Sequence, residues 1–200
     1  MPTTHTIETI THGRYLVERR ESQRLLVGFH GYAETAERHM EELRQIDTGE
    51  EWTLVAVQAL NRFYTRTEEV VANWMTRQDR ELAIADNIEY VRRVVAALGP
   101  YQRLVFAGFS QGAAMAYRAA ATLGADGLII LGGDIPPDVD TVQVPVLLGR
   151  GERDDWYTEE KLKKDLKSLP NATVCRFDGG HEWTDGFRDA ARAFLSGMRR

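Results

Sequence analysis

The sequence predicts an α/β protein with a mostly parallel central sheet and helices on both faces of that sheet. Short, continuous apolar runs recur along the chain, and segments with a helical stripe of apolar residues lie between them. Continuous apolar runs are typical of parallel strands that are buried on both faces. Strands that alternate with helices over short connections form an α/β sheet, so the order of the elements leads to this fold class.

The predicted strands share one pattern. The first follows the polar N-terminus, and most of the others are runs rich in Leu, Val and Ile. The predicted strands are Tyr15–Val17, Leu25–Phe29, Thr53–Val57, Arg103–Ala107, Gly127–Leu131, Val144–Leu148 and Thr173–Phe177. Because their patterns agree, we expect these strands to form one sheet.

The segments between the strands have helical periodicity. From Ile84 to Leu98, apolar residues recur every three or four positions, which marks one face of a helix. Residues 113–123 are small and apolar on nearly every side, which predicts a helix buried in the protein. We also expect a helix after the segment His30-Gly31-Tyr32, with His39 on its surface and without a functional role. Two further stripes are Leu162, Leu166 and Leu169, and Phe187, Ala191, Phe194 and Met198.

One connection is longer than the others and runs from about Asn61 to Gln78. It is rich in Arg, Thr and aromatic residues, so it could line a site or carry a small lid. No linker, repeat or low-complexity tract divides the sequence. The length is 200 residues, and a typical domain has about 150. Residues 1–200 are therefore expected to form a single domain.

The composition excludes several classes of protein. The formal net charge is −5, so the chain lacks the basic surface of a protein held by nucleic-acid phosphates. Cys175 is the only cysteine, which excludes an intrachain disulfide and a cysteine-rich zinc site. The N-terminus is polar, and no apolar stretch reaches the length of a membrane span. We expect a cytoplasmic protein with no nucleic-acid partner and no stable membrane association.

The motif Gly108-Phe109-Ser110-Gln111-Gly112 carries the strongest chemical signal. It is a G-x-S-x-G sequence that follows a predicted strand and opens a predicted helix. Such a turn strains the serine backbone and brings its flanking residues so close that only glycine fits. The Ser110 hydroxyl would then project above the sheet, at the positive end of a helix. The motif predicts that Ser110 is a nucleophile.

A serine nucleophile needs a base and an acid, and in this arrangement they follow it in the order acid, then histidine. Only His181 lies after the last predicted strand, so it is the expected base. The acid should follow the strand 144–148, where Asp154 and Asp155 are both available, and Asp154 is preferred. Asp134, after the preceding strand, is an alternative.

An oxyanion hole needs two backbone N–H groups aimed at one point. Gln111, the residue after the nucleophile, is expected to supply one of them. The loop His30-Gly31-Tyr32 is expected to supply the other from Tyr32, with a flexible Gly31 that lets the chain turn.

These segments together resemble the α/β-hydrolases, and within them the phospholipase/carboxylesterase family that includes acyl-protein thioesterases. The matching segments are 30–32, 108–112, 151–154 and 179–182. The resemblance implies an α/β-hydrolase fold with little or no cap domain and a triad of Ser110, Asp154 and His181. It also implies a small-molecule ester or thioester substrate and no metal or organic cofactor. It leaves the oligomeric state open.

The chain also departs from the family pattern. Arg150 stands where the family's H-G-x-x-D motif has histidine, and Tyr32 stands where small aliphatic residues are common. We expect Trp74, Trp156 and Trp183 to contact the substrate, with Tyr32, Phe63 and Tyr64 near them. So many aromatic side chains favour a short acyl or aromatic group over a long lipid chain.

The preferred function is that of a carboxylesterase that acts through an acyl-enzyme. The same triad could serve a thioesterase or a lysophospholipase, and a lactone-opening hydrolase or an acyltransferase would also keep it. A different class of protein would retain the fold only to bind a small molecule, without catalysis.

Overall fold

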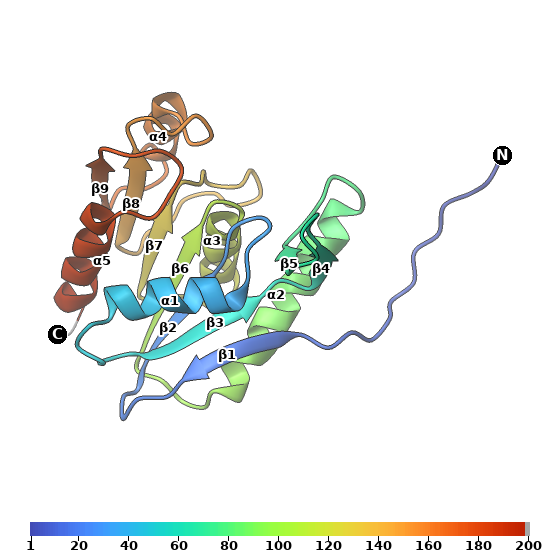
Figure 1. The fold of residues 1–200 in the computed structure, drawn as a ribbon, viewed down its shortest axis with the longest axis horizontal. Coiled ribbons are helices and arrows are strands. Elements are labelled where there is room, and N and C mark those ends of the chain that lie inside the picture. The colour runs from blue at the N-terminus through green and yellow to red at the C-terminus, as the bar shows by residue number, and fades with distance from the viewer. Residues whose placement is uncertain (199–200) are drawn as a thin grey trace.

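A computed structural model describes residues 1–198, and its centre is one seven-stranded sheet (Figure 1). The strands of this sheet are β1 (Arg14–Glu18), β2 (Arg24–Phe29), β3 (Thr53–Gln58), β6 (Arg103–Phe109), β7 (Gly127–Leu131), β8 (Val146–Gly151) and β9 (Ala172–Phe177). Every strand that the sequence predicts is present. The spatial order is β1-β3-β2-β6-β7-β8-β9.

The sheet is parallel except at one edge, where β1 runs antiparallel to β3. This confirms the predicted fold class. In the register of β2 and β6, Phe29 lies opposite Gly108. The loop after β2 and the turn after β6 therefore leave the sheet side by side, at the carboxyl ends of the strands where α/β proteins place their sites.

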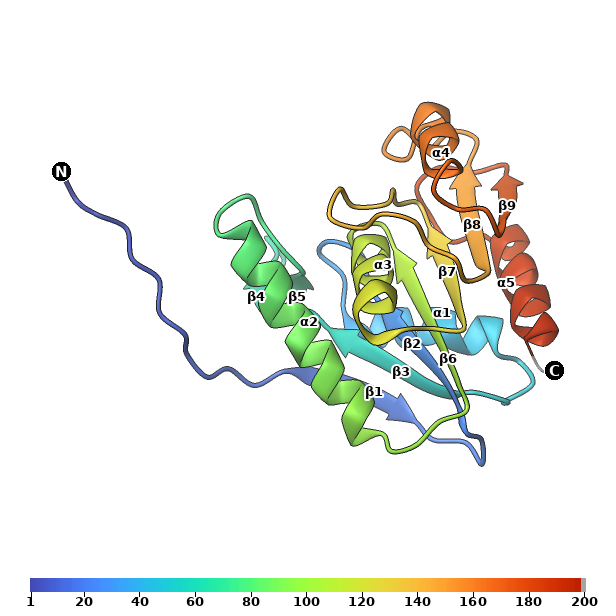
Figure 2. The same ribbon diagram turned by 180° about the vertical axis from the view of Figure 1, so that it is seen from behind.

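Helices cover both faces of the sheet (Figures 1 and 2). The helices are α1 (Ala36–Ile46), α2 (Arg80–Ala97), α3 (Gln111–Leu123), α4 (Glu159–Asp165) and α5 (Asp185–Gly197). Helices α1 and α5 share one apolar core with the sheet, and α2, α3 and α4 share the other. Helix α4 is shorter than its apolar stripe predicts, since Leu166 and Leu169 lie beyond its end.

The long connection after β3 contains a hairpin that the sequence did not predict. Its strands are β4 (Asn61–Tyr64) and β5 (Val70–Asn73), which pair antiparallel. The hairpin stands beside α2, apart from the central sheet (Figure 1). An isolated antiparallel bridge joins Ala72 to Glu34, which lies in the loop after β2. The connection is thus attached to the loop that precedes α1.

His39 on α1 is buried, and the expectation of a surface histidine is wrong. Its exposed fraction is 1%. The ring lies above Gly28 of β2, where an added Cβ would come within 2.4 Å of the His39 ring. The buried residues of α1 also include Ala36, Met40 and Leu43, so His39 belongs to the face that packs on the sheet.

The N-terminal residues before β1 form an extended arm that projects away from the sheet (Figures 1 and 2). Within residues 1–198, no helix combines the length and apolar character needed to cross a membrane.

Candidate active site

Ser110 lies on a sharp turn between β6 and α3. Its φ of 54° and ψ of −117° place it in a backbone conformation that non-glycine residues rarely adopt. A Cβ at Gly108 would lie 2.4 Å from the Gly112 carbonyl oxygen, and one at Gly112 would lie 2.0 Å from the Phe29 carbonyl oxygen. The turn therefore needs glycine at both positions, because any side chain there would collide with backbone, as the motif predicts.

The turn brings Ser110 into contact with His181. The Ser110 hydroxyl lies 2.7 Å from His181 Nε2. His181 follows β9, and its Nδ1 lies 2.8 Å from Asp154 Oδ2. With the hydroxyl donating to Nε2, the ring carries its proton on Nδ1 and donates it to the carboxylate. Such a chain of contacts allows a histidine to remove the serine proton.

The structure distinguishes among the three candidate acids. Asp154 is buried and contacts the His181 ring. Asp155 is exposed, and Asp134 pairs with Lys161 at 3.6 Å. Asp154 is therefore the candidate that the fold places beside the histidine.

The Asp154 carboxylate is oriented by its own loop. Its Oδ1 accepts hydrogen bonds from the backbone N–H groups of Trp156, at 2.8 Å, and Tyr157, at 2.9 Å. Arg150, the residue that departs from the family pattern, donates from Nε to the Tyr157 carbonyl oxygen at 2.9 Å. The Tyr157 hydroxyl donates to Asp165 at 2.9 Å. Arg150 and Asp165 thus fix the loop that presents the acid, a role that the sequence analysis did not anticipate.

The loop after β2 is fixed by a buried histidine. His30 Nδ1 lies 2.7 Å from the Gly31 carbonyl oxygen, and the Ala59 N–H donates to His30 Nε2 at 3.0 Å. Nδ1 is therefore the donor and the ring is neutral, and burial lowers the pKa of His30 to about 4. The carbonyl and N–H of one trans peptide point in opposite directions. Because His30 holds the Gly31 carbonyl, it also fixes the direction of the Tyr32 N–H.

Gly31 plays a different part from the flexible turn that was expected. The left-handed residue of this loop is Ala33, with a φ of 57°, and not Gly31. The Gly31 N–H donates to Glu34 Oε2 at 2.8 Å, and an added Cβ at Gly31 would lie 3.0 Å from both Glu34 and Phe109. A side chain at position 31 would therefore crowd both neighbours, which would have to shift by a few tenths of an ångström. Within residues 1–198, no hydrogen-bond partner occupies the N–H of Tyr32 or of Gln111, the two expected oxyanion donors.

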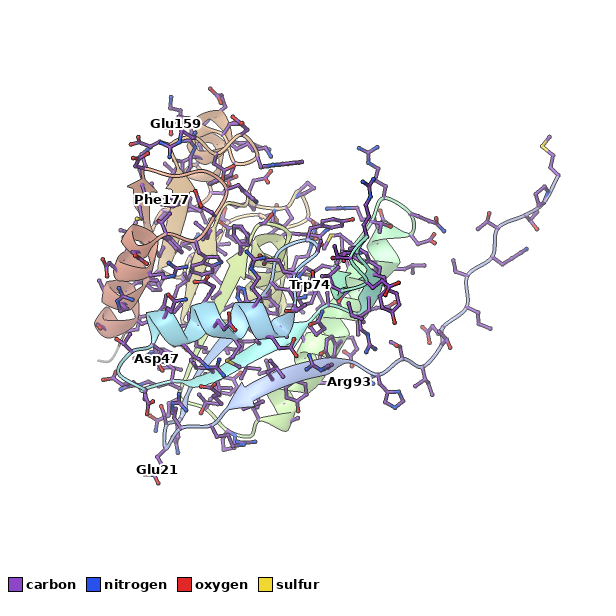
Figure 3. The ribbon with its side chains drawn as sticks, in the orientation of Figure 1. Glu21, Asp47, Trp74, Arg93, Glu159 and Phe177 are labelled. Carbon is purple, nitrogen blue, oxygen red and sulfur yellow. The ribbon has the colours of Figure 1, made fainter. Side chains whose placement is uncertain are left out.

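The three tryptophans expected at the substrate occupy different environments. Trp156 is 75% exposed, and its ring centroid lies 6.5 Å from that of His181. Trp183 is partly buried against His39 and Phe187. Trp74 is 0% exposed, so the expectation that it contacts substrate is wrong. Figure 3 labels Trp74 where the hairpin meets the body of the protein.

Three other aromatic residues lie on β4 and on the loop of residues 30–34 after β2, here called the oxyanion loop for its expected role: Tyr32, Phe63 and Tyr64. Tyr32 is 59% exposed, and its ring lies 5.7 Å from that of Phe63 on β4. Tyr64 is exposed on the same strand. The hairpin therefore contacts the oxyanion loop through Phe63, and the expectation that this connection lines a site or carries a lid stays a prediction.

The parallel sheet and the serine on a strained strand-to-helix turn define the α/β-hydrolase fold. The family model for serine hydrolase (FSH1) matches residues 20–128, more than half of the sequence. The chain belongs to this serine hydrolase family. None of the curated proteins compared with the chain matches it.

Solved structures share the fold at low sequence identity. A carboxylesterase from Bacillus cereus has a TM-score of 0.76 and 14% identity, over 92% of this chain and 94% of its own. Acyl-protein thioesterase 2 from Zea mays has a TM-score of 0.75 and 16% identity, over 93% and 99%. A phospholipase/carboxylesterase from Dyadobacter fermentans has a TM-score of 0.71 and 20% identity, over 94% and 99%.

Proposed function

We propose that the protein hydrolyses carboxylic esters of small molecules through an acyl-enzyme on Ser110. The observation that supports this most strongly is the chain of contacts at the site. Ser110 Oγ lies 2.7 Å from His181 Nε2, and His181 Nδ1 lies 2.8 Å from Asp154 Oδ2. Membership of the serine hydrolase (FSH1) family supports the same chemistry at a coarser level.

In the first half of the reaction, Ser110 Oγ attacks the ester carbonyl carbon while His181 Nε2 takes the hydroxyl proton. Asp154 holds the ring in the required tautomer and stabilises the imidazolium that forms. The backbone N–H groups of Tyr32 and Gln111 donate to the oxyanion. When the carbon–oxygen bond to the alcohol breaks, His181 returns the proton to the leaving group.

In the second half, water replaces the alcohol. His181 removes a proton from this water as it attacks the acyl carbonyl, and the same two N–H groups stabilise the second oxyanion. The bond to Ser110 then breaks, Ser110 regains its proton from His181, and the acid departs. The protein side chains supply every proton transfer, so the proposal requires no metal and no organic cofactor.

The proposed substrate carries a short acyl or an aromatic group. Trp156 and Tyr32 are both strongly exposed; the Trp156 ring lies 6.5 Å from that of His181, and the Tyr32 backbone N–H is a proposed oxyanion donor. Exposed aromatic rings bind flat or compact groups by stacking and apolar contact. A long acyl chain would instead need an extended apolar channel to cover it.

A thioesterase is the main alternative, because the same residues would cleave an acyl thioester. A lysophospholipase is a further alternative with the same triad. The folds shared with an acyl-protein thioesterase and with a phospholipase/carboxylesterase are compatible with both. Rates of hydrolysis of an oxygen ester and a thioester of the same short acid would distinguish a carboxylesterase from a thioesterase. A receptor that has lost catalysis is disfavoured, because serine, histidine and carboxylate are all in contact.

The test is hydrolysis of p-nitrophenyl esters from acetyl to palmitoyl by the wild type and Ser110→Ala. We expect turnover that is greatest for short chains, and a loss of at least about 10³-fold in the variant, since a triad serine is indispensable to the acyl-enzyme route. Ser196→Ala, at an exposed position on α5, is the control for the same substitution. Equal activity of wild type and Ser110→Ala would refute the proposal.

A further inference from the structure

The residues Ala72, Asn73, Trp74 and Met75, here called the 72–75 segment, bind the loop that carries Tyr32. The Ala33 N–H donates to the Ala72 carbonyl oxygen at 3.0 Å, and the Ala72 N–H donates to the Glu34 carbonyl oxygen at 3.1 Å. These two bonds form the antiparallel bridge between Glu34 and Ala72. The loop is thus paired with the end of the hairpin on the side immediately after Tyr32.

The same segment also binds Gln111, the residue whose N–H is the second proposed oxyanion donor. The Trp74 N–H donates to Gln111 Oε1 at 2.8 Å, and Gln111 Nε2 donates to the Met75 carbonyl oxygen at 2.9 Å. Both ends of the side-chain amide are used. The first residue of α3 is therefore attached to a chain segment more than thirty positions earlier in the sequence.

The Trp74 side chain completes the connection from inside the protein. Its Nε1–H donates to the His30 carbonyl oxygen at 2.8 Å, and its ring packs against those of Phe29, at 5.4 Å, and His30, at 5.2 Å. Asn87 of α2 donates to the Trp74 carbonyl oxygen at 2.9 Å. Since Trp74 is wholly buried, these bonds form in a region without competing water.

We propose that Trp74 and the Gln111 side chain are positioning residues that set the separation and direction of the two oxyanion donors. The inference rests on the proposed function. An oxyanion donor is effective only when it lies about 2.7–3.1 Å from the developing charge. The Tyr32 and Gln111 N–H groups come from loops after different strands, and the 72–75 segment bonds to both loops. One rigid element therefore holds both donors.

The test begins with Trp74→Phe, which removes the indole N–H and keeps a buried aromatic ring. The second variant is Gln111→Met, which removes both side-chain hydrogen bonds and keeps the Gln111 backbone N–H. Loss of a whole oxyanion donor lowers kcat by about 10²–10³-fold. Displacement of a donor should have a smaller effect, so we expect kcat to fall by about tenfold in each variant while KM stays within about twofold.

A second readout reports on the oxyanion hole itself. The substrates are p-nitrophenyl acetate and its thiono analogue, in which sulfur replaces the carbonyl oxygen. Sulfur accepts hydrogen bonds weakly, so a thionoester depends less on the two donors. We expect the ratio of kcat/KM for the ester to that for the thionoester to fall several-fold in both variants. A general loss of stability would lower both rates and leave the ratio unchanged.

Trp52→Phe is the matched control. Trp52 is also fully buried, and it directly precedes β3 at the end of the strand opposite the proposed site. This variant should keep the wild-type ratio even if it lowers the melting temperature. If Trp74→Phe fails to fold, Gln111→Met, whose side chain is only partly buried, still decides the question.

The outcomes separate the inference from the proposed function. Folded variants with wild-type kcat and an unchanged ester-to-thionoester ratio would overturn the inference and leave the esterase proposal intact. A loss of kcat with an unchanged ratio, as in a merely destabilised enzyme, would also overturn it. A wild type that neither hydrolyses an ester nor reacts with a fluorophosphonate at Ser110 would refute the proposed function and the inference with it.

Discussion

The nucleophile turn and the oxyanion loop stand side by side at the end of the sheet, yet they are built in different ways. The bend of the turn is set by close backbone approaches within residues 108–112 and to its neighbour Phe29, while its Gln111 side chain is also bonded to Trp74 and Met75. The oxyanion loop is held by groups from two other places, at Ala59 and in the 72–75 segment, which bonds to it through Ala72 and Trp74. The bend that presents Ser110 is therefore local in sequence, whereas the oxyanion loop depends on contacts over long distances along the chain.

This difference implies that the two halves should fail differently. An atom added to the turn clashes with backbone that belongs to a strand and a helix, so the clash cannot be relieved by moving a side chain. A change in the supports of the oxyanion loop removes one of several hydrogen bonds and leaves the others. We expect large, all-or-none effects in the turn and graded effects in the loop.

The largest effect is expected from Gly112→Ala in the turn. The new Cβ would lie 2.0 Å from the Phe29 carbonyl oxygen and 2.6 Å from that of His30, so the backbone itself must shift. Steric changes of this kind belong to the class that destabilises by about 4–5 kcal/mol or more. Urea unfolding and esterase assays should show a protein that is unfolded or inactive.

Gly197→Ala is the control for this substitution. Within residues 1–198, no atom other than those of its chain neighbours and of the α5 backbone lies within 4 Å of the Cβ that it would add. Its free energy of unfolding should stay within about 0.5 kcal/mol of the wild type, as for most surface changes. A stable and active Gly112→Ala would show that the turn is more pliable than the crowding indicates.

The same contrast explains what the sequence could predict. The G-x-S-x-G motif, the strands and the order of serine, acid and histidine can be read from short segments, and the structure brings Ser110, Asp154 and His181 together. The position of Trp74 could not be read in this way. Its burial depends on a hairpin whose pairing with Glu34 bridges two separate connections, and nothing in the local sequence indicates that partner.

His39 is an instructive intermediate case. The residues Ala36, Met40, Leu43 and Ile46 recur at helical spacing, and His39 lies on the same side of α1. This stripe could have placed it in the core. A histidine is polar, which favours a place on the surface. The structure shows that Gly28 of β2, which has no side chain, leaves room for the His39 ring between α1 and the sheet.

A graded effect is expected at Glu34, whose carboxylate accepts the Gly31 N–H. Glu34→Ala leaves that N–H without its partner, which should lower the free energy of unfolding by about 1–2 kcal/mol. It should also lower kcat several-fold, because the peptide that carries the Tyr32 N–H loses one of its supports. Glu34→Gln keeps an oxygen that can accept the bond, so its activity should lie closer to the wild type. Urea unfolding and ester hydrolysis measure both effects.

Arg38→Ala controls for the loss of charge around Glu34. Arg38 lies 3.4 Å from Glu34 Oε1 and is itself exposed, so removing it should change stability by less than about 1 kcal/mol. If Glu34→Ala and Arg38→Ala have equal effects, the hydrogen bond to Gly31 does not support the loop, and the contrast with the nucleophile turn is weaker than proposed.

At neutral pH the smallest effect is expected at His39 on α1, where stability depends on pH only below about pH 6.5. Burial lowers the pKa of His39 from 6.5 to about 3. The unfolded chain therefore binds a proton at this position more readily than the folded protein does. The associated stability is fully present above pH 6.5 and decreases as the pH falls toward 3, by about 1.4 kcal/mol per pH unit.

His39→Leu removes this contribution. Between pH 6 and pH 4.5 we expect the free energy of unfolding to fall less steeply in the variant than in the wild type. The two slopes should differ by about 1.4 kcal/mol per pH unit. His30, whose pKa is also lowered by burial, is present in both proteins, so most of its contribution cancels in the difference. His5→Leu, at an exposed position of the N-terminal arm, is the control. Parallel pH profiles for wild type and His39→Leu would mean that the pKa of His39 is nearly the same in the folded and the unfolded protein. The packing around His39 on α1 would then adjust to a charged ring, unlike the rigid backbone around the nucleophile turn.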